Sequence, residues 1–426
     1  MKQEEREVLW VDRIQWFKRA GYGLFVHFGL YSMLGGIYKG TPSPRNAEWI
    51  MRHLQIPVAE YKKLAETFDP TELDPVAIVR RAKAWGMQYV VVTAKHHDGF
   101  ALYDSRVSDY TVMHTPYGRD IIKAFADACA KEEMPFGIYY SQMQDWEHPD
   151  GNGNTWDFDP AEQDFSRYFY GKCLPQVREL LTGYGKPCLL WFDTPYDMPK
   201  PLCEELAATV KALQPDCLIN GRIGYGLGDY RQMADNSIPR NVYHGAFEVP
   251  MTLNRSWGYS ILDTGWATPA DVIRNLVQIR GRGGNLLLNI GPDGCGNVPK
   301  ASTDVLDAVG AWLEKNGESI FDTAPFPDFP YLNRWGDVTY RKETNTLYLH
   351  ILKYPTIHPR ISLLALASKV QEVRLLQGGT PLAFAQAYDL AREEHRLSVT
   401  VPQTAPDPVD TVIAVTLAED PHVQEL

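Results

Sequence analysis

Leu189-Leu190-Trp191-Phe192-Asp193 is an apolar run of the β type that ends in a single carboxylate. Three other apolar runs also end in polar side chains, and they span Gly23–His27, Tyr89–Asp98 and Phe136–Ser141. Parallel barrels place their chemistry at the carboxyl ends of their strands. Four such endings, which supply His, His-His-Asp, Tyr-Ser and Asp in chain order, therefore predict a barrel mouth that holds a polyhydroxylated ligand beside a carboxylate.

The part of the chain up to about residue 320 alternates β-like runs with helical patterns, which is typical of parallel β/α architecture. The clearest helix is predicted to begin after Asp74 as N-cap, with Pro75 in its first position, and to stop at Gly86. Further helices are predicted over 120–131, around 177–181, over 204–213 and over 302–316, and further strands over 217–222 and 284–292. The fold class predicted from this alternation is α/β, a (β/α)8-like TIM barrel.

The sequence beyond the proline-rich stretch 325–330 has a different pattern of apolar and turn residues. Short alternating runs such as Val338–Tyr340, Leu347–Leu352 and Leu397–Val401 are separated by turn residues. This pattern predicts an antiparallel β-sandwich. We therefore expect a catalytic barrel over residues 1–324 and a C-terminal β-sandwich domain over 325–426.

Composition excludes several classes of partner. The 426 residues carry a formal net charge of −11, which argues against nucleic acid or an anionic membrane surface as partner. The first ten residues, MKQEEREVLW, lack the apolar core of a secretory signal, and no stretch approaches the roughly 18 apolar residues of a membrane span. The six cysteines show no C-x-x-C spacing and are expected to be reduced thiols of a cytoplasmic protein.

Asp193 is the first candidate for chemistry. A carboxylate that follows Trp191-Phe192 would have an aromatic wall and hydrogen-bonding neighbours, which suit a nucleophile that stays ionised at neutral pH. The alternative is an N-cap, because Asp-Thr-Pro also starts helices.

A glycosidase needs a second carboxyl group within about 10 Å of the first. Asp235 lies in the polar segment 228–239, and Glu248 ends the short run Gly245–Glu248. A carboxyl on a loop can reach over a bound sugar, whereas a carboxyl at a strand end lies deeper in the barrel mouth and is held more rigidly. The alternatives are a turn-forming role for Asp235 and a buried, paired acid for Glu248.

His27, His96 and His97 are candidates for either metal or sugar contacts. Imidazoles on adjacent barrel strands often bind metals, but the first strand lacks His-x-His spacing. Adjacent residues of a strand point to opposite sides, so His96 and His97 can both face the pocket only where the strand has turned. We expect hydrogen bonds to sugar hydroxyls and no metal; for one of the three, a core histidine is the alternative.

Arg222 would be costly to bury unpaired, so it is expected to meet Asp193 or Asp235 at the mouth. Glu48-Trp49 supplies an acceptor and an aromatic wall, and Trp257 supplies a second wall. Ordinary loop packing is the alternative for each of these loops.

Taken together, these segments resemble the α-L-fucosidases of glycoside hydrolase family twenty-nine. The resemblance covers roughly residues 10 to 320. It rests on the shared order of Gly23-Leu24-Phe25-Val26-His27-Phe28-Gly29, Asn46-Ala47-Glu48-Trp49, Ala94-Lys95-His96-His97-Asp98-Gly99-Phe100, Tyr139-Tyr140-Ser141, Leu190-Trp191-Phe192-Asp193, Ser256-Trp257-Gly258-Tyr259 and Gly283-Gly284-Asn285-Leu286-Leu287-Leu288-Asn289-Ile290-Gly291-Pro292.

The resemblance implies a retaining exo-enzyme that removes terminal α-linked L-fucose from oligosaccharides or glycoconjugates without a metal or other cofactor. By motif position, Asp193 is similar to the family nucleophile, and Asp235, with Glu248 second, to its acid/base. The Trp-Glu pair of relatives is Phe247-Glu248 here. The residues that resemble its sugar contacts are His27, Glu48, Trp49, His96, His97, Tyr140, Trp191, Arg222 and Trp257.

Two other classes of protein stay open at this point. A metal-dependent barrel hydrolase would use the histidines, and a non-catalytic fucose-binding protein would bind the sugar without turnover. Linkage preference, the balance between hydrolysis and transfer, and assembly into a homo-oligomer are not fixed by the sequence.

Overall fold

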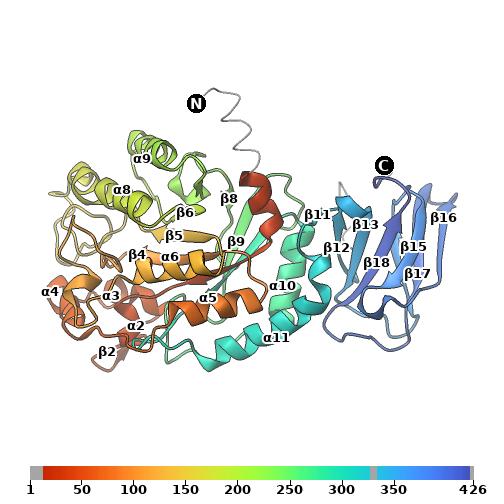
Figure 1. The fold of residues 1–426 in the computed structure, drawn as a ribbon, viewed down its shortest axis with the longest axis horizontal. Coiled ribbons are helices and arrows are strands. Elements are labelled where there is room, and N and C mark those ends of the chain that lie inside the picture. The colour runs from red at the N-terminus through yellow and green to blue at the C-terminus, as the bar shows by residue number, and fades with distance from the viewer. Residues whose placement is uncertain (1–12, 327–332, 423–426) are drawn as a thin grey trace.

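The computed structural model describes residues 13–326 and 333–422, which form a β/α barrel followed by an all-β part (Figure 1). The N-terminal residues that we expect not to be a secretory signal, and most of the proline-rich stretch 325–330, lie outside the described residues. No helix in the described part of the chain is both long and apolar enough to cross a membrane.

The barrel sheet contains eight parallel strands in the order β7-β6-β5-β4-β1-β10-β9-β8. Their bounds are β1 Tyr22–Val26, β4 Val90–Lys95, β5 Phe136–Tyr140, β6 Leu189–Phe192, β7 Leu218–Ile219, β8 Arg231–Gln232, β9 Phe247–Thr252 and β10 Asn285–Ile290. The two edge strands meet through a parallel bridge between Asn220 and Tyr230, and the Asp229 N–H donates to the Ile219 carbonyl at 2.7 Å. The predicted (β/α)8-like barrel is confirmed.

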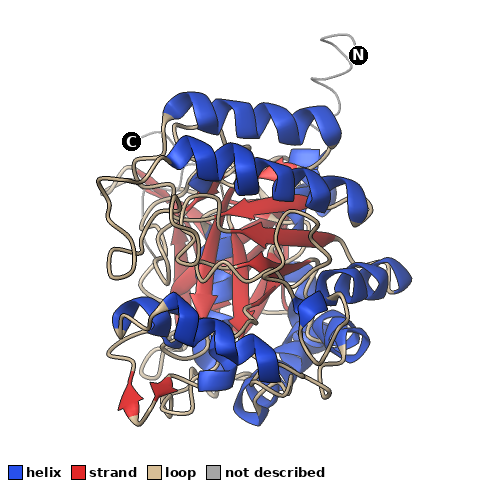
Figure 2. Cartoon of the chain, turned by 90° about the vertical axis from the view of Figure 1, so that its left-hand side faces the viewer, coloured by secondary structure: helices blue, strands red, loops and turns tan. Residues whose placement is uncertain are grey.

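Helices surround the strands on the outside of the barrel (Figure 2). The longer ones are α5 Pro75–Ala84, α6 Ile121–Lys131, α8 Leu174–Gly183, α9 Lys200–Leu213, α10 Pro269–Gly281 and α11 Lys300–Asn316. Asp74 caps α5 by accepting from the Ala77 N–H at 3.0 Å, as the sequence predicts. Gly86, just beyond α5, has a φ of 83°, a conformation that glycine adopts without steric cost.

Shorter elements lie in the loops that follow the strands. They are α2 Tyr31–Leu34, β2 Ile37–Tyr38, β3 Thr41–Pro42, η1 Ala47–Trp49, α3 Ile50–His53, α4 Val58–Tyr61, η2 Lys62–Thr67, η3 Val112–His114, α7 Phe165–Tyr168, the π-turn η4 Phe169–Cys173, η5 Gly221–Ile223 and η6 Gly317–Ser319. The predicted strand over 217–222 is shorter than expected, because the chain leaves the sheet after Ile219 and makes the turn η5.

Successive strand residues face two different apolar layers. Phe25, Tyr139 and Trp191 belong to the cluster inside the barrel. Tyr140 and Phe192, each one residue further along its strand, belong to the layer between sheet and helices. This period of two decides which aromatic side chains can reach the mouth.

The C-terminal part contains a five-stranded antiparallel sheet in the order β11-β12-β13-β18-β15 and a three-stranded one in the order β14-β17-β16. Their strands are β11 Ala324–Pro325, β12 Gly336–Arg341, β13 Thr346–Ile351, β14 Arg360–Leu364, β15 Val370–Leu375, β16 Phe384–Asp389, β17 Glu394–Thr400 and β18 Thr411–Leu417, with the turns η7 Lys342–Thr344 and η8 Gln377–Gly379. The predicted antiparallel character is confirmed. Strand β11 spans the predicted domain boundary at 324/325, which stays a prediction.

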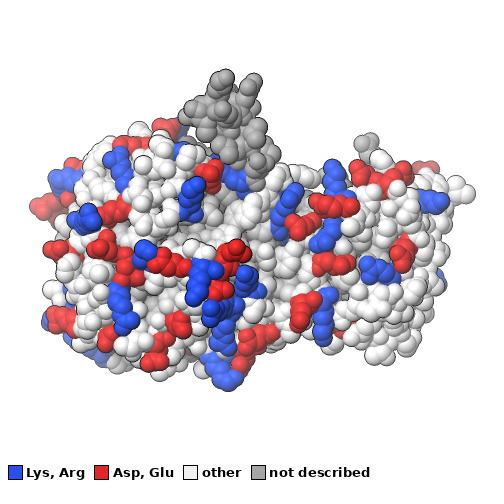
Figure 3. Space-filling model, viewed as in Figure 1, with Lys and Arg blue, Asp and Glu red and all other residues white. Residues whose placement is uncertain are grey.

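Charged side chains cover both parts of the molecule. On the face shown in Figure 3, acidic and basic residues are interspersed and form no large field of one sign. The barrel and the C-terminal sheets are joined by an ion pair of 2.8 Å between Arg282 and Asp337.

Candidate active site

A cavity of about 120 Å³ lies at the carboxyl ends of the barrel strands. Its floor and walls come from strands β1 and β6, from η1 and η5, and from the loops beyond β1, β4, β6, β8 and β9. Its lining residues are Phe25, His27, Asn46, Trp49, His96, Trp191, Asp193, Thr194, Arg222, Asp235 and Trp257. Eight residues that the sequence singles out are thus brought together here.

Asp193 follows β6 directly, and its side chain is held by donors on both oxygens. Oδ1 accepts from Arg222 Nη1 at 2.8 Å and from the Thr194 N–H at 2.9 Å, and Oδ2 accepts from the Tyr139 hydroxyl at 2.9 Å. Burial raises the pKa of this carboxyl, but the charge of Arg222 and the hydrogen bonds from Arg222 and Tyr139 outweigh burial, so the pKa lies below its usual value. The carboxylate is therefore ionised and aimed at the cavity, as a nucleophile must be.

Arg222 joins the two carboxylates of the cavity. Nη1 binds Asp193, and Nη2 makes an ion pair with Oδ1 of Asp235, which lies in the loop after β8. The guanidinium also lies over the Trp191 ring, 4.9 Å from its centroid. Two carboxyl groups held by one guanidinium can flank a single sugar ring.

His27 and His97 are buried, and burial lowers their pKa values to about 4 and about 3. The Asn289 amide donates to the Trp257 carbonyl, so its oxygen faces His27 Nδ1 at 2.6 Å, and the ring proton lies on Nδ1. The hydroxyl of Ser141 donates to the Gln144 carbonyl and so accepts from His97 Nδ1 at 2.7 Å. Both rings are therefore neutral at pH 7. His27 lines the cavity and has an Nε2 that can accept a sugar hydroxyl, whereas His97 is not one of the lining residues, and its Nε2 lies 3.5 Å from Asp193 Oδ2.

The side chain of His96 also reaches the cavity, because β4 ends at Lys95 and the chain turns at His96 and His97. Its ring stacks on Tyr139 with centroids 5.5 Å apart, and burial lowers its pKa well below the usual value. Its buried Nδ1 has no hydrogen-bond partner in the described part of the chain. A buried polar atom without a partner at a cavity wall indicates a site for a polar ligand.

Glu48 lies on η1 and is 1% exposed. Oε2 accepts from the backbone N–H groups of Trp257 and Gly258 at 3.1 and 3.0 Å, while Oε1 has no partner among the described residues. Burial, opposed by these hydrogen bonds, raises its pKa to about 7. Glu48 thus fixes the loop that carries Trp257 and keeps one oxygen unpaired.

Glu248 is not among the residues that line the cavity. It is the second residue of β9, near the amino end of the strand, and is fully buried inside the barrel. Its two oxygens accept from the Trp191 indole N–H at 2.8 Å and the Tyr89 hydroxyl at 2.7 Å. The run Gly245–Glu248 predicts a strand that finishes at Glu248, but β9 continues to Thr252.

Tyr140, expected among the sugar contacts, points away from the cavity. It faces the layer of helices, where its hydroxyl donates to Gln176 at 2.9 Å. Tyr139 takes the place at Asp193, and its backbone pairs with Trp191 of β6. The register between β5 and β6 identifies Tyr139 as the residue beside Asp193, and this register cannot be derived from the sequence of either strand alone.

The loop after β5 contacts the backbone of Asp193 and helps to fix its position. Gln142, which is fully buried, accepts from the Asp193 backbone N–H and donates to the Arg222 carbonyl, both at 2.9 Å. Asp145 anchors this loop by pairing with Lys95 at 3.0 Å and Lys172 at 2.9 Å, all of them buried. Gln142 is not among the residues predicted from the sequence, because it sits two residues beyond the end of its strand.

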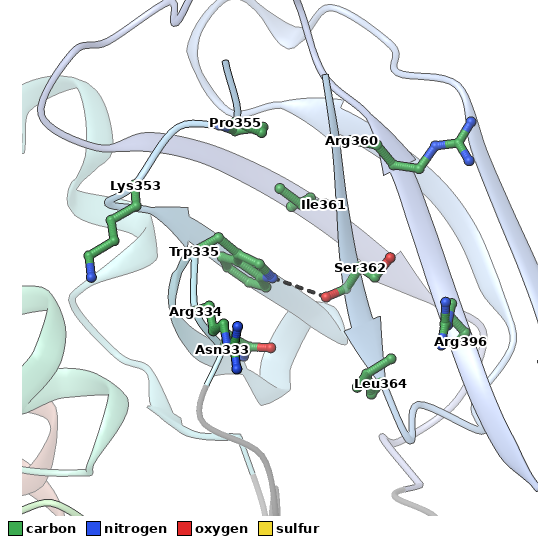
Figure 4. A pocket seen from close by; sticks show the side chains of 10 residues that line it. All are labelled: Asn333, Arg334, Trp335, Lys353, Pro355, Arg360, Ile361, Ser362, Leu364 and Arg396. Atoms are coloured by element: carbon green, nitrogen blue, oxygen red, sulfur yellow. Dashed lines mark hydrogen bonds between the residues drawn. The ribbon is translucent and has the colours of Figure 1, made fainter. Parts of the chain in front are cut away.

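A larger cavity of about 600 Å³ lies in the C-terminal part (Figure 4). Trp335 donates to the Ser362 carbonyl across it, and the side chains of Lys353 and Arg360 point in opposite directions. No Asp or Glu is among the described residues that line it. The barrel mouth, which has both carboxylates, is therefore the candidate active site.

Cleavage of a glycosidic bond needs a pair of carboxyl groups that flank it, and the barrel mouth supplies such a pair. The class of protein that this fold and site define is a glycoside hydrolase. Within residues 13–326 and 333–422, no group of three or more His, Cys, Asp or Glu side chains is arranged to hold a metal ion.

Comparison with known proteins gives the family. A profile described as Alpha-L-fucosidase matches residues 4–318, so the chain belongs to the alpha-L-fucosidase family. The structure is similar to an alpha-L-fucosidase from Lactobacillus casei in complex with alpha-L-fucose product (42% identity, TM-score 0.70, covering 72% of this chain and 99% of that one). It is also similar to alpha-L-fucosidase isoenzyme 1 from Paenibacillus thiaminolyticus (35% identity, TM-score 0.85, covering 96% and 100%).

A more distant relative is the human plasma alpha-L-fucosidase, which is 27% identical over 91% of this chain and 85% of its own length. The resemblance drawn from the sequence is therefore confirmed: the chain is a glycoside hydrolase that acts on terminal α-linked L-fucose.

Proposed function

We propose that the chain releases terminal L-fucose from oligosaccharides or glycoconjugates by a retaining double displacement, with Asp193 as nucleophile and Asp235 as acid/base. The observation that carries this proposal is the contact of one guanidinium, that of Arg222, with both carboxylates at the mouth. Retaining enzymes need the two groups only about 5–5.5 Å apart.

In the first step, the Asp193 carboxylate forms a bond to the anomeric carbon while the bond to the leaving oxygen breaks. Asp235 gives its proton to that oxygen. In the second step, Asp235 removes a proton from water, the water oxygen attacks the anomeric carbon, and fucose leaves Asp193 as a free carboxylate. Because Asp235 starts in an ion pair with Arg222, it must exchange that contact for the glycosidic oxygen when substrate enters.

The remaining side chains of the cavity suit a neutral, hydroxyl-rich ring. The unprotonated Nε2 of His27 accepts a hydroxyl proton, while Trp49, Trp191 and Trp257 supply apolar faces. The cavity is small and is closed below by the packed interior of the barrel, which favours a single terminal sugar over the middle of a chain.

The nucleophile is tested with Asp193→Ala and an aryl α-L-fucoside. We expect kcat/KM to fall by far more than about tenfold, a loss of ~1.4 kcal/mol of transition-state stabilisation. Asp216→Ala, which removes an exposed carboxylate before β7, is the matched control and should keep full activity. NMR of the first product formed should show the α-anomer, and a β-anomer would contradict the retaining mechanism.

The acid is tested by comparing Asp235→Ala and Glu248→Ala on fucosides with good and poor leaving groups. The true acid matters least when the leaving group needs no proton. We expect this pattern for Asp235→Ala. If Glu248→Ala, and not Asp235→Ala, loses less activity on the good leaving group than on the poor one, Glu248 is the acid.

We also propose a cytoplasmic location, supported by the six cysteines, all free and four of them buried. Subcellular fractionation of the source cells tests this. Whether the chain forms a homo-oligomer stays a question for light scattering of the purified protein.

A further inference from the structure

Two exposed tyrosines stand beside the mouth at equivalent distances along the chain. Tyr196 lies three residues beyond Asp193, and Tyr225 lies three residues beyond Arg222. Their side chains are 58% and 55% exposed, among the most exposed large apolar groups of the described barrel. Scattered exposed aromatic residues are ordinary. Neither tyrosine is itself a lining residue of the cavity, but each lies three residues beyond one that is, Asp193 or Arg222.

The backbone under both rings is strained. Thr194, Tyr196 and Tyr225 have φ values of 41°, 38° and 50°, which lie in the left-handed region that side chains other than glycine rarely adopt. Such residues persist only where the surrounding structure holds them, and they cluster at ligand clamps. Both tyrosines are therefore held in these backbone conformations by the surrounding structure.

Hydrogen bonds tie the two loops together. The Tyr225 hydroxyl donates to the Met198 carbonyl at 2.9 Å, and the Met198 N–H donates to the Pro195 carbonyl at 2.8 Å. Thr194, which lines the cavity, accepts from the Gln144 side chain at 2.8 Å. The rings are thus presented to solvent from a fixed frame.

The acid fixes which side of the cavity the aglycone occupies. Asp235 must contact the leaving oxygen, and in this structure Asp235 is held by Arg222 on η5. The group joined through that oxygen therefore leaves the cavity over the loop that contains Tyr225. Trp257 and Glu48 lie across the mouth, on the side of β1 and β10.

We propose that Tyr196 and Tyr225 form a platform for the sugar to which fucose is attached. This inference rests on the proposed function. An aromatic face packs against the C–H face of a pyranose ring, so the platform selects fucosides whose aglycone is a sugar ring over those with an acyclic aglycone.

The test compares two substrates that differ only in what leaves. α-L-Fucosyl fluoride has no aglycone ring, whereas an α-L-fucosyl disaccharide, chosen as the one that the wild type cleaves fastest, has a pyranose. For the double variant Tyr196→Ala/Tyr225→Ala we expect kcat/KM on the disaccharide to fall about tenfold, while the value on the fluoride changes by less than about twofold.

Matched variants separate the ring from other effects. Tyr225→Phe keeps the ring and removes the bond to Met198, so it should keep most of the activity on the disaccharide. Tyr388→Ala removes an exposed tyrosine of the C-terminal sheet and should alter neither substrate.

A disaccharide rate that changes by less than twofold in the double variant would overturn the platform, and so would an equal loss on both substrates. A wild type that releases fucose from neither substrate would instead overturn the proposed function. The activity on the fluoride also shows whether each variant has folded.

Discussion

Replacing Arg222 with methionine should move the pH range in which the enzyme works. Among the described residues that line the cavity, Arg222 is the sole side chain with a permanent positive charge, because the pKa values of His27 and His96 are lowered by burial. Burial alone would raise the pKa of Asp193. Without Arg222, the nucleophile keeps its hydrogen bonds to Tyr139 and Thr194 but loses the charge that holds it ionised.

The size of the effect follows from the ion pair. An opposite charge within about 4–6 Å lowers a carboxyl pKa by roughly 1–3 units, each worth ~1.36 kcal/mol. The Arg222–Asp193 contact is 2.8 Å, and the side chains are only 21% and 11% exposed, so solvent weakens it little. We expect the acidic limb of the pH profile to move upward by about 1–3 units, because the carboxylate that attacks exists only above its pKa.

The assay is the pH dependence of kcat/KM on α-L-fucosyl fluoride, whose leaving group needs little help from an acid. Arg222→Met should lose more activity near pH 5 than near pH 8, while the control Arg222→Lys, which keeps a charge, should stay closer to the wild type. An acidic limb that stays in place in Arg222→Met would show that Asp193 is kept ionised by something else, and it would refute the reasoning.

Three further predictions concern buried groups behind the cavity. Glu248→Leu should lower the thermal midpoint, because it leaves the indole N–H of Trp191 and the hydroxyl of Tyr89 without a partner, at a cost of about 1–3 kcal/mol each. The control Glu248→Gln should lower the midpoint less. Equal midpoints for the two variants would argue against these hydrogen bonds. Asp145→Asn should destabilise the fold by about 3–5 kcal/mol, since two buried lysines lose their shared carboxylate, and a denaturant midpoint like the wild type's would contradict this. Burial raises the pKa of Glu248 to about 7, so the folded state holds its proton more tightly than the unfolded state. The stability gained from the protonated Glu248 is complete below about pH 4.5 and is lost as the pH rises through 7. Between about pH 5 and 7, the thermal midpoint of the wild type should therefore fall more than that of Glu248→Gln.

Local signals predicted the barrel well. Asp74 and Asp120 mark the starts of α5 and α6 because their side chains accept from backbone N–H groups of the first helical turn, an interaction confined to neighbours in sequence. The end of a strand is set instead by its partners in the sheet. That is why the short strand β7 and the continuation of β9 beyond Glu248 differ from expectation.

The same distinction separates the predictable part of the site from the rest. Asp193, His27 and Arg222 follow apolar runs, so position along the chain was enough to nominate them. Choosing between Tyr139 and Tyr140 requires knowing which of two adjacent residues faces the barrel interior, and the apolar run is equally hydrophobic on both sides.

The two carboxylates differ in how they are held, and the difference matches the work proposed for each. Asp193 is 11% exposed and receives three hydrogen bonds from a rigid frame, so its oxygens are aimed before substrate arrives. Asp235 is 41% exposed on a loop and is held at one oxygen by Arg222. A nucleophile attacks a single carbon along a single line, whereas an acid/base must first reach the leaving oxygen and then a water molecule. Placing the first group at the end of a strand and the second on a loop allows one arginine to position both without fixing the second in place.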